Sequence, residues 1–242
     1  MSSSISIVIP AYNEEKRLAS TLERILSFLA RGSWASTEIL VVDDGSSDGT
    51  AEVASRYAPN VRLLLNPGNR GKGYSVRHGM LEATGDWILF TDADLSAPIE
   101  EMDKLFAAIG SASPPARVAI GSRALDRSLI GVHQSVFREN AGRVFNLAMR
   151  LIAGLPFWDT QCGFKLFEGR AAKQIFLRQR LERFGFDAEV LFIAKKLKYR
   201  VVEVPVHWSH AEGTKVSMFR DSVGMFVDLL RVRANYWRGL YR

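Results

Sequence analysis

The sequence contains a single cysteine and no long apolar run. Cys162 alone excludes a disulfide framework and a cysteine-based zinc cluster, and it favours a reducing compartment. No apolar stretch approaches the roughly 20 residues that a membrane-spanning helix needs. The N-terminal residues lack a basic segment followed by an apolar run, so we expect no secretory signal. These absences predict a cytoplasmic protein that contacts a membrane only peripherally, at the cytoplasmic face.

Internal repeats and low-complexity tracts are also absent from the 242 residues. Hydrophobic residues make up 47% of the chain, so a sizeable core can be buried, and the length suits one α/β domain. The formal net charge of +6 suits a nucleic acid, an acidic membrane surface or a phosphate-rich substrate. Because the basic residues are not concentrated in one run, we do not expect nucleic-acid binding.

Short apolar runs alternate with helical patterns along the chain. Strands are expected at 5–9, 38–42, 61–65, 87–91, 118–120, 163–167 and 200–206. Helices are expected at 17–29, 47–57, 72–83, 98–109, 134–153, 187–197 and 221–240. Ser46 or Ser47 is the expected cap of the second helix. This order predicts an α/β fold with a Rossmann-like, mostly parallel sheet and helices on both faces.

A polar cluster follows each of the first five predicted strands. The clusters are Pro10-Ala11-Tyr12-Asn13-Glu14, Asp43-Asp44-Gly45-Ser46, Asn69-Arg70-Gly71-Lys72-Gly73, Asp92-Ala93-Asp94 and Gly121-Ser122-Arg123. In doubly wound sheets, ligands bind at the carboxyl ends of the strands. We therefore expect the five clusters to converge along one edge of the sheet and to form a ligand site.

Asp92 and Asp94 directly follow the apolar strand predicted at 87–91. Carboxylates are costly there unless they are paired or bind a metal. Residues two apart in an extended segment face the same side, so both can hold one Mg²⁺ or Mn²⁺ and leave positions open for diphosphate oxygens. The ion would neutralise a leaving nucleoside diphosphate. The alternative is that Asp94 or Ser96 only caps a following helix.

Asp43 and Tyr12 are candidates for holding a nucleoside. Asp43 suits a base N–H or a ribose hydroxyl, and Tyr12 suits stacking on a base, although a tight turn with a helix cap also explains 43–47. The segment 69–73 matches neither common phosphate-loop pattern, and no glycines follow the first strand. A nicotinamide dehydrogenase is therefore not expected. The glycines of 69–73 would instead let the backbone pass close to a donor.

The segments IVIPAYNEE, VVDDGSSDGT, NRGKGYSVRHG, TDADLSAPIEE and DTQCGFKLF together resemble the family 2 glycosyltransferases of the GT-A fold. The resemblance is strongest to the polyprenyl-phosphate branch, which includes dolichyl-phosphate glucosyltransferases and dolichol-phosphate mannose synthases. It implies an inverting hexosyltransferase that moves glucose from UDP-glucose to a polyprenyl or dolichyl phosphate. It also implies one domain over 1–242, with a nucleotide-sugar-binding half (1–125), an acceptor half (126–217) and a C-terminal amphipathic helix (218–242).

The motifs and the resemblance together define a set of candidate site residues. Nucleotide-sugar contacts are expected from Pro10, Ala11, Tyr12, Glu14, Asp43, Asp44, Lys72, Asp92 and Ala93. Acceptor-phosphate contacts are expected from Arg123, Arg138, Arg143 and Lys215, since cationic side chains suit phosphate, although a solvated surface also explains the arginines. Asp94, Asp159 and Arg123 are the expected catalytic residues, and Asp92 and Asp94 the metal ligands. Mannose synthases often carry a metal-binding Gln two residues after the second Asp, and here that residue is Ser96.

The nature of the acceptor decides whether a general base is needed. A phosphomonoester is mostly dianionic at neutral pH and is already a nucleophile. A sugar hydroxyl would need a base, for which Asp159 is the candidate, unless it orients the acceptor or is a loop residue. Cys162 is expected to be a buried packing residue, and Asp187 and Glu189 suit the first turn of a helix.

Three alternatives stay open. The first is mannosyl transfer from GDP-mannose to the same class of lipid. The second is a soluble family 2 transferase that acts on a saccharide hydroxyl. The third is a nucleotide-sugar-binding regulatory protein without turnover.

The helix predicted at 221–240 carries a broad apolar surface together with arginines and aromatic residues. These features suit a helix that lies on an anionic membrane. A helix packed on the domain core with a solvated basic face explains the same pattern.

Overall fold

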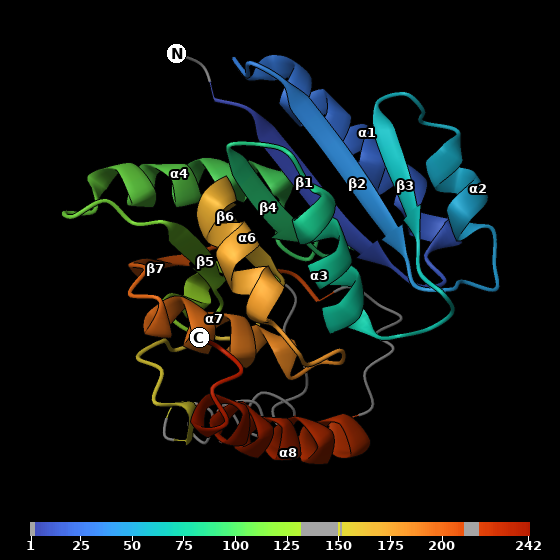
Figure 1. Ribbon diagram of the computed structural model, residues 1–242. Coiled ribbons are helices and arrows are strands. Elements are labelled where there is room, and N and C mark those ends of the chain that lie inside the picture. Colours follow the sequence, from blue (N-terminus) through green and yellow to red (C-terminus); the bar gives the residue numbers. More distant parts are fainter. Residues whose placement is uncertain (1–2, 132–149, 151, 211–217) are drawn as a thin grey trace.

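The computed structural model describes residues 3–131, 150, 152–210 and 218–242, without the side chains of 218–223 (Figure 1). The strands of the described chain are β1 (Ile5–Ala11), β2 (Thr37–Asp43), β3 (Val61–Leu65), β4 (Trp87–Thr91), β5 (Val118–Ser122), β6 (Phe164–Glu168) and β7 (Val201–Pro205). The α-helices are α1 (Glu15–Arg31), α2 (Thr50–Ser55), α3 (Lys72–Glu82), α4 (Met102–Ser111), α6 (Gly169–Arg178), α7 (Phe186–Lys196) and α8 (Met218–Trp237). Two 3₁₀ turns, η1 (Ile99–Glu101) and η2 (Arg127–Leu129), complete this part.

The seven strands form one sheet in the order β3-β2-β1-β4-β6-β5-β7. All neighbouring strands are parallel except at β6, which pairs antiparallel with both β4 and β5. The mostly parallel sheet predicted from the sequence is therefore confirmed. The insertion of β6 between two strands that precede it in the chain was not predicted, because a pattern of apolar residues does not specify strand order.

Apolar residues on the two faces of the sheet form two separate cores. Val8 belongs to the core beneath α3, α6 and α7, whereas Ile7 and Ile9 belong to the core beneath α1 and α4. This division follows from the period of two along a strand. Strands buried on both faces consist of nearly continuous apolar residues, as 5–11 does. Helices on both faces, as predicted, are confirmed.

Most predicted elements that the structure describes agree with it to within a few residues, but the start and cap of the second helix do not. Helix α2 begins only at Thr50, after Gly49, and neither Ser46 nor Ser47 caps it. Both serines are instead bound to the loop after β1, where Ser46 Oγ accepts from Asn13 N at 2.9 Å and Ser47 N donates to Asn13 Oδ1 at 2.8 Å. Helix α6 was not predicted, and the helix expected at 134–153 lies mostly outside the described residues.

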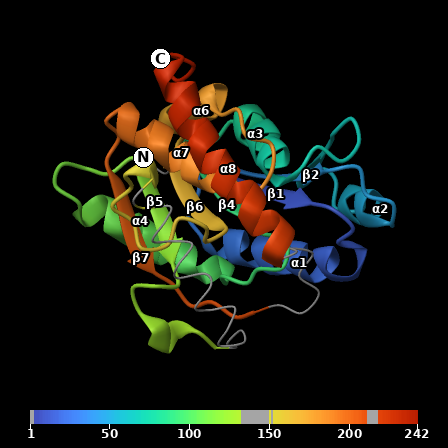
Figure 2. The ribbon, with the colours of Figure 1, turned by 90° about the horizontal axis from the view of Figure 1, so that it is seen from below.

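Helix α8 lies below the rest of the fold in Figure 1, on the side to which β1 and β2 point, and Figure 2 views it from that side. Its Leu229 and Val232 are buried in the core shared with α7. The end of the chain is anchored as well, because the Tyr241 hydroxyl donates to Glu189 Oε1 at 2.6 Å. None of the helices in the described ranges is long and apolar enough to cross a bilayer.

Candidate active site

The five polar clusters lie at the carboxyl ends of strands along one edge of the sheet, and a series of contacts joins the first four of them. Asp44 N donates to Ala11 O at 2.8 Å, and Gly71 N donates to Asp44 Oδ2 at 2.7 Å. Lys72 Nζ then lies 2.6 Å from Asp92 Oδ1. Contacts at the start of β6 continue the series, since Asp92 N donates to Gly163 O at 3.2 Å. The predicted convergence at the carboxyl ends of the strands is confirmed.

Asp43 and Asp44 follow β2 and have different surroundings. Asp43 is buried and accepts from the backbone N and the hydroxyl of Ser46. Asp44 accepts from Arg70 N at 3.0 Å through Oδ1 and from Gly71 N through Oδ2. Asn66 Nδ2 also donates to Asp44 Oδ1, at 2.8 Å. Asp44 therefore holds the 69–73 segment in place, and its direct contact with a nucleotide stays a prediction.

Gly45 is required where the loop after β2 meets the loop after β3 at Gly68. It adopts φ 73°, and a Cβ built on it would lie 2.7 Å from the carbonyl carbon of Gly68. Only glycine combines this left-handed conformation with so close an approach of two backbones.

The segment after β1 offers an aromatic ring beside these loops. Tyr12 keeps 38% of its surface exposed, whereas Ala11 is buried and its carbonyl already accepts from Asp44 N. Glu14 lies 2.9 Å from the guanidinium of Arg17. Pro10 is half-buried. Of the predicted contacts in this segment, Tyr12 therefore presents the largest surface to a ligand.

Asp92 and Asp94 occupy a turn that follows β4. Leu95 adopts φ 46°, and its backbone N donates to Asp92 O at 3.2 Å, which reverses the chain directly after Asp94. Asp94 Oδ1 accepts from Ser96 N at 2.9 Å. Neither Asp94 nor Ser96 caps the following helical segment, whose first turn, η1, is preceded by Pro98. The helix-cap alternative for this motif is therefore wrong.

The pair of carboxylates fits a hard divalent cation. Burial raises the pKa of Asp92, and repulsion from Asp94 and Asp187 adds to this effect. A bound cation would relieve that repulsion. Among the described residues no group of three or more His, Cys, Asp or Glu side chains is arranged as a metal site. Two protein ligands would leave positions for diphosphate oxygens and water.

The backbone of Gly163 packs closely against the carboxylate of Asp92. A Cβ built on Gly163 would lie 2.0 Å from Asp92 Oδ2, so any larger residue would displace the carboxylate. The absence of a side chain at this position, just before β6, thus lets the Asp92 carboxylate pack directly against the backbone.

A buried ion pair lies next to this turn and was missed by the sequence analysis. Lys165, the second residue of β6, is fully buried, and its Nζ contacts Asp187 Oδ1 and donates to Cys162 O at 2.6 Å. Asp187 was interpreted only as a residue of the first turn of a helix. A lysine inside an otherwise apolar strand was the available signal, because a buried lysine requires a charged or polar partner.

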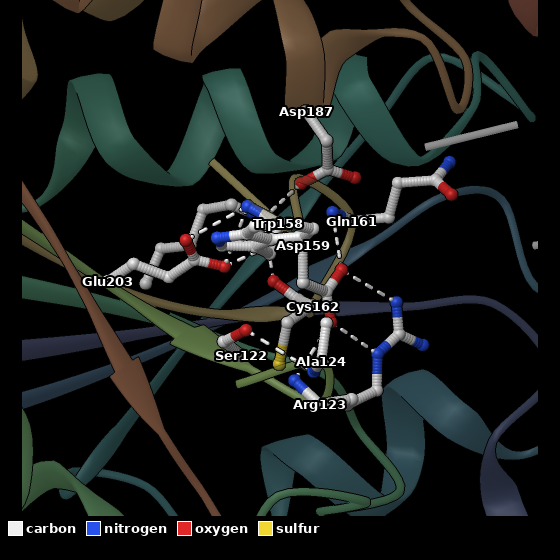
Figure 3. A network of polar contacts seen from close by, with 10 residues as sticks. Ser122, Arg123, Ala124, Trp158, Asp159, Gln161, Cys162, Asp187 and Glu203 are labelled. Carbon is white, nitrogen blue, oxygen red and sulfur yellow. Dashed lines mark hydrogen bonds and ion pairs between the residues drawn. The ribbon is translucent and has the colours of Figure 1, made fainter. Parts of the chain in front are cut away.

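Arg123, directly after β5, and Asp159 form an ion pair at the centre of a network of polar contacts (Figure 3). Arg123 Nε lies 2.7 Å from Asp159 Oδ2, its Nη2 lies 2.9 Å from Oδ1, and its backbone N also donates to Oδ2. The guanidinium carbon lies 5.4 Å from the centre of the Trp208 ring. Glu203 holds the loop by accepting from the backbone N of Asp159 at 2.7 Å. The described residues offer no hydrogen-bond partner to Arg123 Nη1, which is the nitrogen left for an anion.

This pairing determines what Asp159 can do chemically. Burial opposes its charged form, but Arg123 outweighs burial and lowers the pKa of Asp159 to about 2. A carboxylate that holds its proton so weakly is a poor general base at neutral pH. Asp159 is suited to orienting Arg123. Cys162 is buried, and burial raises the pKa of its thiol to about 12, as expected for a packing residue.

The remaining candidates for acceptor contact, Arg138, Arg143 and Lys215, lie outside the described residues. The segment after β7 does reach the site, because Ser209 N donates to Ser96 O at 2.9 Å and Trp208 stacks on Arg123. Trp208 was not among the predicted site residues.

Comparison with known proteins identifies clear relatives. The family described as glycosyl transferase family 2 matches residues 6–176. The dolichyl-phosphate beta-glucosyltransferase of Drosophila melanogaster is 40% identical, over 98% of this chain and 77% of that protein. The enzyme of the same name from Homo sapiens is 37% identical over 98% and 77%, and that from Saccharomyces cerevisiae is 34% identical over 98% and 76%.

Solved structures share the fold at lower sequence identity. Mannosyl-3-phosphoglycerate synthase from Rubrobacter xylanophilus superimposes with a TM-score of 0.68 at 19% identity, covering 98% of this chain and 74% of that one. Glucosyl-3-phosphoglycerate synthase from Mycobacterium tuberculosis, in complex with Mn²⁺, UDP and glucosyl-3-phosphoglycerate, gives 0.67 at 19% identity, covering 95% and 80%. These likenesses establish the GT-A architecture.

Proposed function

Because the chain belongs to glycosyltransferase family 2, we propose that it transfers glucose from UDP-glucose to dolichyl phosphate or another polyprenyl phosphate. The observation that carries the proposal is the match over 98% of the chain to dolichyl-phosphate beta-glucosyltransferases at 34% to 40% identity. The convergence of Asp43, Asp92 and Arg123 on one edge of the sheet supports it.

Different residues of the site bind the donor and the acceptor. Tyr12 and Asp43 hold the nucleoside. Asp92 and Asp94 hold a divalent cation, Mg²⁺ or Mn²⁺, which when bound neutralises the charge of the departing diphosphate. Arg123, kept in one orientation by Asp159 and Trp208, binds the acceptor phosphate through the guanidinium edge that faces away from Asp159.

The reaction requires no protein base. An oxygen of the lipid phosphate attacks C1 of glucose, and the bond from C1 to the diphosphate oxygen breaks with inversion. The nucleophile is already an anion at neutral pH, so no proton has to be removed. This agrees with Asp159, whose carboxylate is engaged by Arg123 through both oxygens. Transfer to a saccharide hydroxyl would require a base that Asp159 is poorly suited to provide.

A panel of donors and acceptors tests the proposal. With Mn²⁺ present, we expect radiolabelled UDP-glucose to give a lipid-linked product with dolichyl phosphate. The matched acceptor is dolichol, which has the same chain without the phosphate and should accept no glucose. GDP-mannose with dolichyl phosphate should give little product. Equal transfer to dolichol or to free sugars, or a preference for GDP-mannose, would contradict the assignment.

Peripheral membrane contact through α8 is part of the proposal. The helix is packed on the core through Leu229 and Val232, while Phe226, Leu230 and Trp237 on its outer side are 45%, 51% and 77% exposed. Exposed basic residues accompany them, at Arg231, Arg238 and Arg242. An exposed apolar strip beside cations suits an anionic lipid surface. The sequence allowed either core packing or membrane contact for this helix. In this proposal α8 does both, because the two contacts involve different sides of the helix.

Vesicle flotation tests this contact. We expect the variant F226S/L230S/W237S to lose roughly tenfold or more in partitioning onto vesicles that contain phosphatidylserine, because three exposed apolar side chains are removed. The matched control is L65S/L125S/L177S, which replaces exposed leucines elsewhere on the surface. It should float like the parent. Equal flotation of both variants would rule out α8 as the contact.

A further inference from the structure

Lys72 stands beside the two carboxylates assigned to the metal. It is the first residue of α3, and its Nζ lies 2.6 Å from Asp92 Oδ1 and 5.4 Å from the centre of the Phe90 ring. The side chains of Lys72 and Asp92 keep 24% and 31% of their surface exposed, so both border the open part of the site. The ion pair is thus reachable by a ligand.

The backbone around Lys72 is tightly constrained. A Cβ at Gly71 would lie 2.6 Å from Glu182 O, and a Cβ at Gly73 would lie 2.6 Å from Leu181 O. The start of α3 therefore sits directly against the segment before α7, and Tyr74 N donates to Glu182 O at 3.0 Å. This packing fixes where the Lys72 side chain begins, and it directs the ammonium toward Asp92.

The surrounding charges leave Lys72 as the counterion of the metal-binding turn. Asp92, Asp94 and Asp187 all attract the Lys72 ammonium. Asp187 already has its own cation, because Lys165 is in direct contact with it. The other side of the Asp92 carboxylate faces Gly163, whose hypothetical Cβ would overlap Oδ2. A divalent cation that approaches Asp92 from the open side therefore meets the oxygen that Lys72 holds.

We propose that Lys72 couples cation binding to donor binding by exchanging partners. This coupling rests on the function proposed above. Without the donor, Lys72 holds Asp92 and opposes a divalent cation. When the cation arrives with the nucleoside diphosphate, the ammonium leaves Asp92 for a diphosphate oxygen, so its charge is compensated in both states. The cation alone would leave the lysine beside it without an anion, and the two ligands therefore bind cooperatively.

Titrations with Mn²⁺ and UDP test the exchange without any turnover. On the parent protein, we expect UDP to strengthen Mn²⁺ binding, followed by electron paramagnetic resonance, by about 5- to 150-fold, the usual range of coupling between two sites. In K72M, Mn²⁺ alone should bind severalfold more tightly than to the parent, and the enhancement by UDP should be severalfold smaller than in the parent, leaving only the part that comes from direct coordination of Mn²⁺ by the diphosphate. K72R keeps the charge and should behave like the parent.

Two controls separate the possible failures. K104M removes a lysine that pairs with Glu101 at 2.7 Å away from the metal-binding turn, and it should leave both affinities unchanged. Unchanged Mn²⁺ affinity in K72M, with and without UDP, would overturn the exchange while leaving the donor assignment intact. If the parent itself fails to bind Mn²⁺ with UDP, the donor assignment fails and the exchange fails with it.

Discussion

Replacing Asp92 and Asp94 together by alanine is expected to lower kcat/KM for glucosyl transfer by at least about 10³-fold, since a metal that neutralises a leaving group supplies several kcal/mol. The two carboxylates are the acidic side chains of the turn after β4, and the described residues contain no cluster of three or more metal-ligating side chains that could replace them. Without them the cation would be held only by the diphosphate, and the leaving group would depart with its charge poorly compensated.

The measurement is the rate of formation of glucosylated lipid at saturating Mn²⁺. D103A is the matched control, because Asp103 is an exposed aspartate in the first turn of α4, and it should keep the parent's rate. A melting temperature close to that of the parent would show that the double variant is folded. Normal turnover of D92A/D94A in the presence of a chelator would contradict the metal assignment and reduce the proposal to a shared architecture.

The second large effect concerns stability. We expect K165M to lower the free energy of unfolding by about 3–5 kcal/mol, the usual cost of removing one partner from a buried ion pair. The Lys165 side chain is 1% exposed and that of Asp187 is 6% exposed. Removing the ammonium leaves the Asp187 carboxylate with little water to solvate it and takes a donor from Cys162 O.

Chemical denaturation of three variants measures this effect. The double variant K165M/D187N should recover much of the loss, because the second substitution removes the uncompensated charge. R24M breaks the pair between Arg24 and Glu100, whose side chains are 48% and 41% exposed, and should cost only about 0–1 kcal/mol. Equal losses in K165M and R24M would show that the buried pair contributes no more than a surface one.

The local pattern of apolar and turn residues was sufficient to predict much of the fold. The predicted bounds of β3 and β4, 61–65 and 87–91, agree with the structure, since a short, mainly apolar run between turn residues identifies a strand. The edge of the sheet where the site lies could also be predicted, because parallel strands separated by helices bring their carboxyl ends together. The same argument placed Asp92 and Asp94 at this edge, although it expected them in an extended segment and the structure has them in a turn.

The pairing of side chains across the site could not be predicted in this way. Arg123 was expected to bind phosphate, and Asp159 to act as a base or to orient the acceptor, each considered alone. The structure joins them through a bidentate contact, and that contact lowers the pKa of Asp159 and removes its suitability as a base. Asp44 was grouped with the nucleotide contacts, and the structure shows it binding the backbone of Arg70 and Gly71.

The sequence by itself determined the class of fold, the edge that carries the polar clusters, the place of the acidic pair after β4 and the family. Only the tertiary structure decided which charges are neighbours. Lys165 meets Asp187 because β6 runs antiparallel between β4 and β5, and Arg123 meets Asp159, 36 positions further along the chain, for the same reason. Periodicity reports which face of an element is buried, whereas contacts between distant residues depend on the order and direction of the strands, which no local pattern encodes.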